Sequence, residues 1–231
     1  EDDVNAPFVD ANGQTNGKTN GEVYKVKPGN SKYVDVNKDG VYNDADQGII
    51  GCGQPTFNWG WNNTFNYKNF DFSFFVVGFH GFDIYNATHQ MGYNLIKSQQ
   101  MAGVTPMREL LNRWTPTNTN TDIPGFVKGG TENKDFFSTR FVENGSFIKM
   151  KSITLGYTLP EATCRSLGIN NLRVYASVQN PFHITKYSGL DPEATMGSPL
   201  VQGVDWGAYP NSRNYLIGLN SVSYTHLRAH E

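Results

Sequence analysis

The sequence predicts an all-β chain of about five long antiparallel strands. Apolar and polar side chains alternate over the eleven residues 57–67, the pattern of a strand with one apolar face. Short and long connections alternate between the predicted strands. The 231 residues include 24 glycines, and only 17% are charged while 13% are aromatic. This composition favours strands and turns over helices.

The first two strands form a hairpin with one aromatic face. A tight turn follows Tyr67, and alternation then resumes from Phe70 to Val76. The apolar face carries Phe57, Trp59, Trp61, Phe65, Tyr67, Phe70, Phe72 and Phe74, and small polar side chains occupy the other face. Eleven alternating residues exceed the usual soluble strand of about five or six. The length therefore favours a strand that crosses a membrane within a β-barrel.

Three further strands are predicted in residues 146–160, 171–182 and 214–220. In the first of these, strict alternation places Lys149 and Lys151 on the same face as Ile153 and Leu155. We expect these two lysines to reach a lipid headgroup zone.

The connections include two long segments, 79–145 and 183–212, and a short linker of one helical turn near residue 161. The first long segment is predicted to hold a helix with Thr105 as N-cap and Pro106 at its first position. Residues 1–30 read as a loop. Barrel proteins place long loops outside the cell, so in a barrel we expect the last strand to descend toward the periplasm.

The stretch DVNKDGVYNDAD follows the D-x-N-x-D-G spacing of a calcium loop. The candidate ligands are Asp35, Asn37, Asp39, the carbonyl of Val41, and Asp46. Asp46 stands where an EF-hand has a longer Glu, and no helical pattern flanks the loop. Two interpretations stay open, a structural calcium clip and an Asx-rich turn that needs no ion.

Composition excludes several functions. A net charge of −2 gives no basic field for nucleic acid. Cys52 and Cys164 are too few for a disulfide framework or a zinc site. The longest apolar run, FSFFVVGF, is far shorter than the ~20 residues of a transmembrane helix.

No catalytic constellation is apparent, so we expect no enzyme. Asp191 and Glu193 are a formal candidate for a glycosidase pair, but their Gly- and Pro-containing loop favours solvated side chains. Candidate contacts for cargo or a partner protein are Trp114, Trp206 and Tyr209, which lie in predicted external loops.

Several motifs in a fixed order resemble SusC/RagA-type TonB-dependent outer-membrane transporters of Bacteroidetes. They are KPGNSKYVDVNKDGVYNDADQGIIG, PTFNWGWNNTFNYKNFDFSFFVVGFHG, NRWTPTNTNTDIP, RFVENGSFIKMKSITLGYTLP, LRVYASVQNPFHITKYSGLDPE and GVDWGAYPNSRNYLIGLN. The resemblance covers roughly residues 21–220.

This resemblance implies the C-terminal portion of a transmembrane 22-stranded β-barrel with long extracellular loops. The implied function is import of glycans or peptides across the cell outer membrane. The implied partners are a SusD-like surface lipoprotein, the TonB complex acting through an N-terminal region, and the lipid bilayer. The alternative from residues alone is a secreted carbohydrate-binding β-sandwich stabilised by calcium.

Three segments are expected. Residues 1–55 form an extracellular loop with the Asp-rich motif, and residues 56–220 form the last transmembrane strands and their loops. Residues 221–231 are expected to be a non-native tail read from a sequencing adapter.

Overall fold

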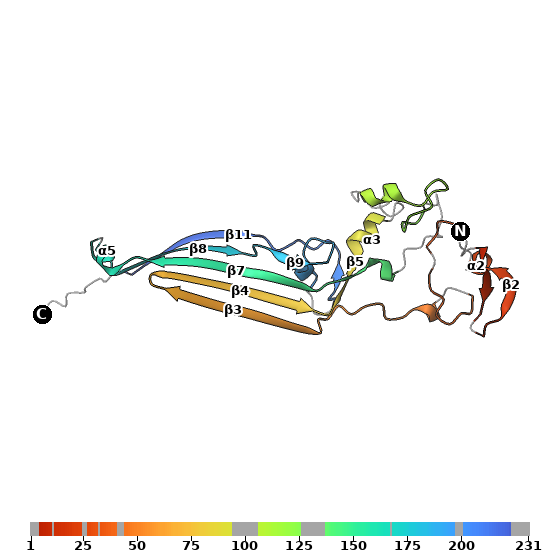
Figure 1. Cartoon of the computed structure of the whole chain (residues 1–231), viewed down its shortest axis with the longest axis horizontal. Coiled ribbons are helices and arrows are strands. Elements are labelled where there is room, and N and C mark those ends of the chain that lie inside the picture. The colour runs from red at the N-terminus through yellow and green to blue at the C-terminus, as the bar shows by residue number, and fades with distance from the viewer. Residues whose placement is uncertain are drawn as a thin grey trace. The chain divides into compact units, whose positions relative to one another are not determined.

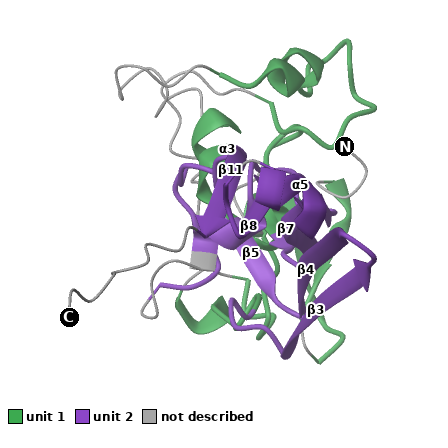
Figure 2. Ribbon diagram, turned by 90° about the vertical axis from the view of Figure 1, so that its left-hand side faces the viewer, with its two compact units in different colours: residues 1–51, 86–142 green, residues 52–85, 143–231 purple. Residues whose placement is uncertain are grey.

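The computed structural model contains two compact units, coloured separately in Figure 2. Unit 1 comprises residues 1–51 and 86–142, and unit 2 comprises residues 52–85 and 143–231. The structure describes residues 5–10, 12–24, 27–31, 33–40, 44–93, 106–125, 137–166, 168–196 and 201–222.

Unit 2 is built on five long strands that lie side by side in one sheet (Figure 1). Every neighbouring pair is antiparallel, and the order is β11-β8-β7-β4-β3. The strands are β3 (Phe57–Tyr67), β4 (Phe70–His80), β7 (Phe147–Thr158), β8 (Asn171–Gln179) and β11 (Asn214–Val222). All five predicted strands are confirmed, and each pairs with its predecessor among the five along the chain. Ser221 and Val222, at the start of the expected tail, lie in β11, and residues 223–231 lie outside the described residues.

The predicted alternation of short and long connections is also confirmed. Only Lys68 and Asn69 separate β3 from β4, and Lys68 has a φ of 53°. Two-residue hairpin loops require positive φ because only such turns match the twist of the strands. The single helical turn expected between β7 and β8 is α5 (Glu161–Ser166).

The two long connections contain short elements. The first holds β5 (Asp83–Asn86), α3 (Ala87–Tyr93), η2 (Arg108–Asn112), η3 (Thr139–Phe141) and β6 (Val142–Asn144). The second holds β9 (His183–Thr185), η4 (Pro192–Met196) and β10 (Val204–Asp205). A three-stranded sheet has the order β10-β5-β6, and β9 pairs with β7. None of the helices in the described residues has the length and apolar character needed to cross a membrane.

A small apolar core sits at one end of the five-stranded sheet. It consists of Phe82, Ile84, Phe147 and Tyr187, with Phe79 packed against it. The rings of Phe79 and Phe147 stack with centroids 5.1 Å apart. This core gathers residues from both long connections onto the start of β7, and so it positions the loops that follow.

Unit 1 corrects the expectation that residues 1–30 are a loop. It contains β1 (Pro7–Val9), β2 (Thr15–Thr19) and α2 (Asn20–Tyr24), followed by η1 (Asp44–Asp46). The Thr19 backbone N–H donates to Glu22 Oε2 at 2.8 Å, and the Glu22 N–H donates back to Thr19 Oγ1 at 3.4 Å. These reciprocal bonds are a capping box. The signal T-x-x-E was present in the sequence, but low apolar content hid it.

The helix predicted from Thr105 is shorter and begins later. In the described residues of this stretch the structure has the 3₁₀ helix η2, with Met107 as N-cap in an extended conformation, so Pro106 lies before the helix. Thr105 lies outside the described residues. The helix ends before Arg113, which has an extended ψ of 159°. Pro116 also favours extended backbone at the preceding residue, Thr115, so the helix does not continue.

Candidate functional site

One face of the five-stranded sheet is apolar and open. Paired residues share a face of a sheet, and the register pairs Trp61 with Val76 and Phe65 with Phe72. Rings from neighbouring strands pack together on this face, and the ring centroids of Phe70 and Tyr157 lie 4.7 Å apart. The large side chains exposed on this face are Phe57, Trp61, Phe65, Tyr67, Phe70, Leu155, Tyr215, Ile217 and Leu219. We call these residues the outer face.

The opposite face, called here the inner face, carries mostly small polar side chains. Thr154 and Ser177 share a hydroxyl–hydroxyl bond of 2.8 Å across β7 and β8. Nearby, the Nε–H of Arg173 in β8 donates to Asp71 Oδ1 of β4 at 2.9 Å. The Nη2 group of the same guanidinium donates to Asp71 Oδ2. This bidentate pair crosses β7 at Gly156, where a Cβ would lie 2.3 Å from Asp71 Oδ1. Gly156 is therefore required for the pair to form.

A β-bulge in β7 corrects the predicted positions of the two lysines. The β4–β7 register pairs Phe75 with Ser152 but Val76 with Met150, which leaves Lys151 as an extra residue. An extra residue reverses the alternation of side chains. As a result, Ile153 lies on the outer face, whereas Lys149 lies on the inner face with its partner Val77. Lys149 is 2% exposed, so it does not reach a headgroup zone.

Asp191 and Glu193 are also not the solvated pair that the loop composition predicted. Lys149 Nζ lies 2.8 Å from Asp191 Oδ2 and 2.7 Å from Glu193 Oε2, and Lys151 pairs with the other oxygen of Glu193. Burial raises the pKa of both carboxyls, but the lysines outweigh it and hold each pKa below its ordinary value. At Asp191, bonds from the backbone N–H groups of Asn211 and Glu193 also lower the pKa. A lone lysine within the apolar run FIKM was the available sequence signal.

The Asp-rich loop is a hydrogen-bonded turn in unit 1. Asp35 accepts bonds from the Asp39 N–H at 3.2 Å and the Gly40 N–H at 2.8 Å. Asn37 Nδ2 donates to Asp39 Oδ2 at 2.9 Å, and Asp46 accepts from the Val36 N–H at 2.9 Å. These bonds are those of an Asx-rich turn.

The candidate calcium ligands of this loop lie partly outside the described residues. Val41 lies outside the described residues. Among the residues that the structure describes, no three His, Cys, Asp or Glu side chains are grouped to hold a metal ion. The short Asp39 and Asn37 side chains do, however, present oxygens of the kind that calcium prefers. Calcium binding by this loop stays a prediction.

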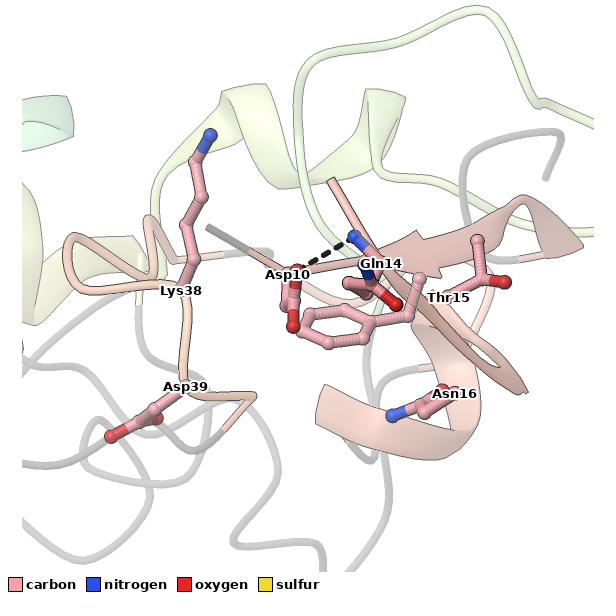
Figure 3. A pocket seen from close by; sticks show the side chains of 7 residues that line it. Asp10, Gln14, Thr15, Asn16, Lys38 and Asp39 are labelled. Carbon is pink, nitrogen blue, oxygen red and sulfur yellow. Dashed lines mark hydrogen bonds between the residues drawn. The ribbon is translucent and has the colours of Figure 1, made fainter. Parts of the chain in front are cut away.

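A pocket that the motifs did not indicate lies beside the same loop (Figure 3). Its lining is polar apart from one ring and consists of Phe8, Asp10, Gln14, Thr15, Asn16, Lys38 and Asp39. Asp10 holds the turn between β1 and β2 by accepting the Gln14 N–H at 2.8 Å.

The aromatic residues predicted as contacts have different surroundings. Trp206 is 60% exposed and Tyr209 is 88% exposed, both in unit 2. Asp205 fixes the turn at Trp206 by accepting the N–H groups of Gly207 and Ala208 at 2.8 and 3.2 Å.

The other oxygen of Asp205 accepts the buried hydroxyl of Tyr187. Desolvation and this carboxylate raise the pKa of Tyr187 well above its ordinary value, so the hydroxyl stays a donor. Trp114, in unit 1, instead packs its ring over Gly29, where a Cβ would lie 2.3 Å from the indole. Gly29 has a φ of 87°.

Sequence comparisons identify relatives of this chain. No protein-family model matches it. It is 36% identical over 199 residues to TonB-dependent receptor P3 of Formosa agariphila, which covers 84% of this chain and 19% of the receptor. It is 32% identical over 196 residues to TonB-dependent receptor SusC of Bacteroides thetaiotaomicron, covering 84% of this chain and 18% of SusC. The chain thus spans about a fifth of the length of these relatives.

Solved structures agree with the sequence relatives. The RagAB peptide transporter matches with a TM-score of 0.61 at 27% identity, over 73% of this chain and 17% of that chain. The RagAB peptide importer in its open-open state matches with a TM-score of 0.62 at 26% identity, over 83% and 20%. The five long strands, with one apolar and one polar face, therefore correspond to part of a barrel wall. The chain belongs to the family of TonB-dependent receptors of the SusC and RagA type.

Proposed function

We propose that this chain forms part of the wall and external loops of an outer-membrane importer. In this proposal the intact receptor takes up glycans or peptides, draws energy from the TonB complex, and works with a SusD-like surface lipoprotein. Its relatives support this, since they are named as receptors, and the RagAB structures as a peptide transporter or importer. Its role is passage and recognition of cargo rather than catalysis.

The exposed outer face is the observation that carries the proposal. An eleven-residue strand such as β3 is about 36 Å long at ~3.3 Å per residue. Tilted by about 40°, it rises about 28 Å, close to the ~25 Å apolar band of an outer-membrane barrel. A soluble sandwich would cover this face with a second sheet. Instead, Phe65 is 53% and Ile217 is 82% exposed.

For cargo recognition, we propose the exposed rings of Trp206 and Tyr209. The bonds to Asp205 hold Trp206 outward in advance of binding, and preorganisation of this kind lowers the cost of recognition. Aromatic faces suit both sugar rings and peptide side chains. An uptake assay with both kinds of cargo therefore identifies the cargo class.

Uptake by the intact receptor in its membrane tests the proposal. Labelled oligosaccharides and peptides are offered to cells with and without TonB, and with and without the proposed SusD-like lipoprotein. Trp206→Ala and Tyr209→Ala are expected to raise the half-saturating concentration about 3- to 10-fold, the scale of one aromatic contact. Tyr215→Ala, on the outer face, is the matched control and is expected to leave it unchanged. Uptake that does not require TonB would contradict the proposed function.

We also propose that the Asp-rich loop is a weak structural calcium clip. Millimolar external calcium would suit such a site, and the loop's D-x-N-x-D-G spacing supports it. Calcium titration by calorimetry on the intact receptor is compared with Asp35→Ala and Asp39→Ala. Loss of binding in both variants is expected, whereas equal binding in all three proteins would remove the calcium proposal.

A further inference from the structure

Four charged side chains and one amide form a closed cluster at the bulge of β7. They are Lys149, Lys151, Asp191, Glu193 and Asn211, and we call them the clasp. The side chains of Lys149 and Asp191 are 2% and 3% exposed. Two lysines face two carboxylates, so the cluster is neutral. Because charges are rarely buried unless paired, each member depends on the others.

The clasp ties both sides of one loop to one point on the wall. Asp191 and Glu193 lie before residues 197–200, and Asn211 lies after Tyr209. The backbone N–H of Asn211 donates to Asp191 Oδ2 at 3.1 Å, and its Nδ2 donates to Glu193 Oε2 at 2.8 Å. The segment between Glu193 and Asn211, whose described stretch 201–210 carries the exposed rings of Trp206 and Tyr209, therefore leaves and returns to the same anchor.

The bulge is what makes this anchor possible. With regular alternation, Lys149 would share the outer face with Ile153, away from the loop's carboxylates. The extra residue Lys151 turns Lys149 to the inner face and keeps a second ammonium group beside Glu193. Bulges of this kind commonly re-aim a side chain next to a functional site.

We propose that the clasp is a positioning device for cargo recognition, which holds the 201–210 stretch as a fixed rim. This inference rests on the proposed function. The clasp residues act through Trp206 and Tyr209 and do not themselves touch cargo. A fixed rim presents both rings without the ordering cost that a mobile loop has on binding.

Lys149→Met in the intact receptor tests the clasp. It removes the charge but keeps an apolar stem, and it leaves Asp191 buried without its cation. Amide hydrogen exchange of residues 201–213 is expected to accelerate about a hundredfold, since loss of one partner of a buried pair is costly. Lys149→Arg keeps a positive charge at this position and is expected to retain most of the exchange protection of residues 201–213. The half-saturating cargo concentration is expected to rise, with the maximal uptake rate little changed.

Arg173→Met is the matched control, because it breaks another inner-face ion pair that does not contact the loop. It is expected to change neither loop exchange nor half-saturation. If Lys149→Met fails to assemble, as judged by the heat-sensitive mobility of the folded barrel, Asn211→Ala carries the same test with both lysines present.

Two results overturn the positioning role, namely unchanged loop exchange in the clasp variant, or faster exchange with unchanged half-saturation. Failure of the proposed function is distinct, because the unmodified receptor would then lack TonB-dependent uptake while its loop exchange still reported on the clasp.

Discussion

Ile217 offers a sharp test of which face of the sheet meets lipid. It is 82% exposed on β11, pairs with Ala176, and lies one residue from the middle of a nine-residue strand. In a barrel, that position is close to the bilayer midplane. A lysine there is expected to destabilise the folded barrel by about 2–4 kcal/mol. At about 1.36 kcal/mol per factor of ten, this is roughly a 30- to 900-fold shift of the folding equilibrium.

A water-exposed Ile217 would give a different result, since surface substitutions usually change stability by no more than about 0.5 kcal/mol. The neighbouring Leu216 provides the control. It is apolar and 51% exposed, but it pairs with Ser177 on the inner face. Leu216→Lys is therefore expected to cost less than half as much as Ile217→Lys.

The assay is urea unfolding of the intact receptor refolded into phospholipid vesicles, followed by the gel mobility of the folded barrel. Ile217→Ala separates loss of the aliphatic side chain from addition of charge. Equal midpoints for Ile217→Lys and Leu216→Lys, or a change below about 0.5 kcal/mol for Ile217→Lys, would refute the outer-face assignment.

Two further perturbations follow from the loops. The lysines lower the pKa values of Asp191 and Glu193 below their ordinary values of 3.8 and 4.5. The ionised carboxylates therefore stabilise the folded loop fully when the pH is above these ordinary values. This stabilisation is lost as the pH falls through the lowered pKa values of the folded state. Loop amide protection, corrected for the intrinsic exchange rate, should be constant from about pH 5.5 to 8 and fall only below about pH 4; a decline already at pH 6 would contradict this. Gly29→Ala forces a β-carbon into the indole that covers it, at a φ of 87°, and should destabilise unit 1 by about 1–3 kcal/mol. Faster proteolysis of unit 1 together with altered tryptophan emission is expected, and unchanged emission would show that the indole lies elsewhere.

The alternation of side chains was sufficient to predict the sheet. In β3, β4, β8 and β11, successive residues point to opposite faces, so periodicity alone assigned Trp61 to the outer face and Asn62 to the inner face. The aromatic face, the hairpin turn at Lys68 and the order of long and short connections followed from the same local rules. The capping box between Thr19 and Glu22 also follows from a local motif, T-x-x-E. The low apolar content of this region had favoured a loop instead.

The bulge in β7 and the clasp could be seen only in the tertiary structure. No rule of periodicity places a bulge at Lys151, because a bulge is defined by the register of the neighbouring strand rather than by its own residues. That one extra residue reversed the face of Lys149. It also brought Lys149 to Asp191, which lies 42 positions further along the chain. The sequence by itself determined long strands with an apolar and a polar face, since side-chain alternation is a property of each strand. The clasp that holds the loop depends on distant residues meeting in space, and only the folded chain determines it.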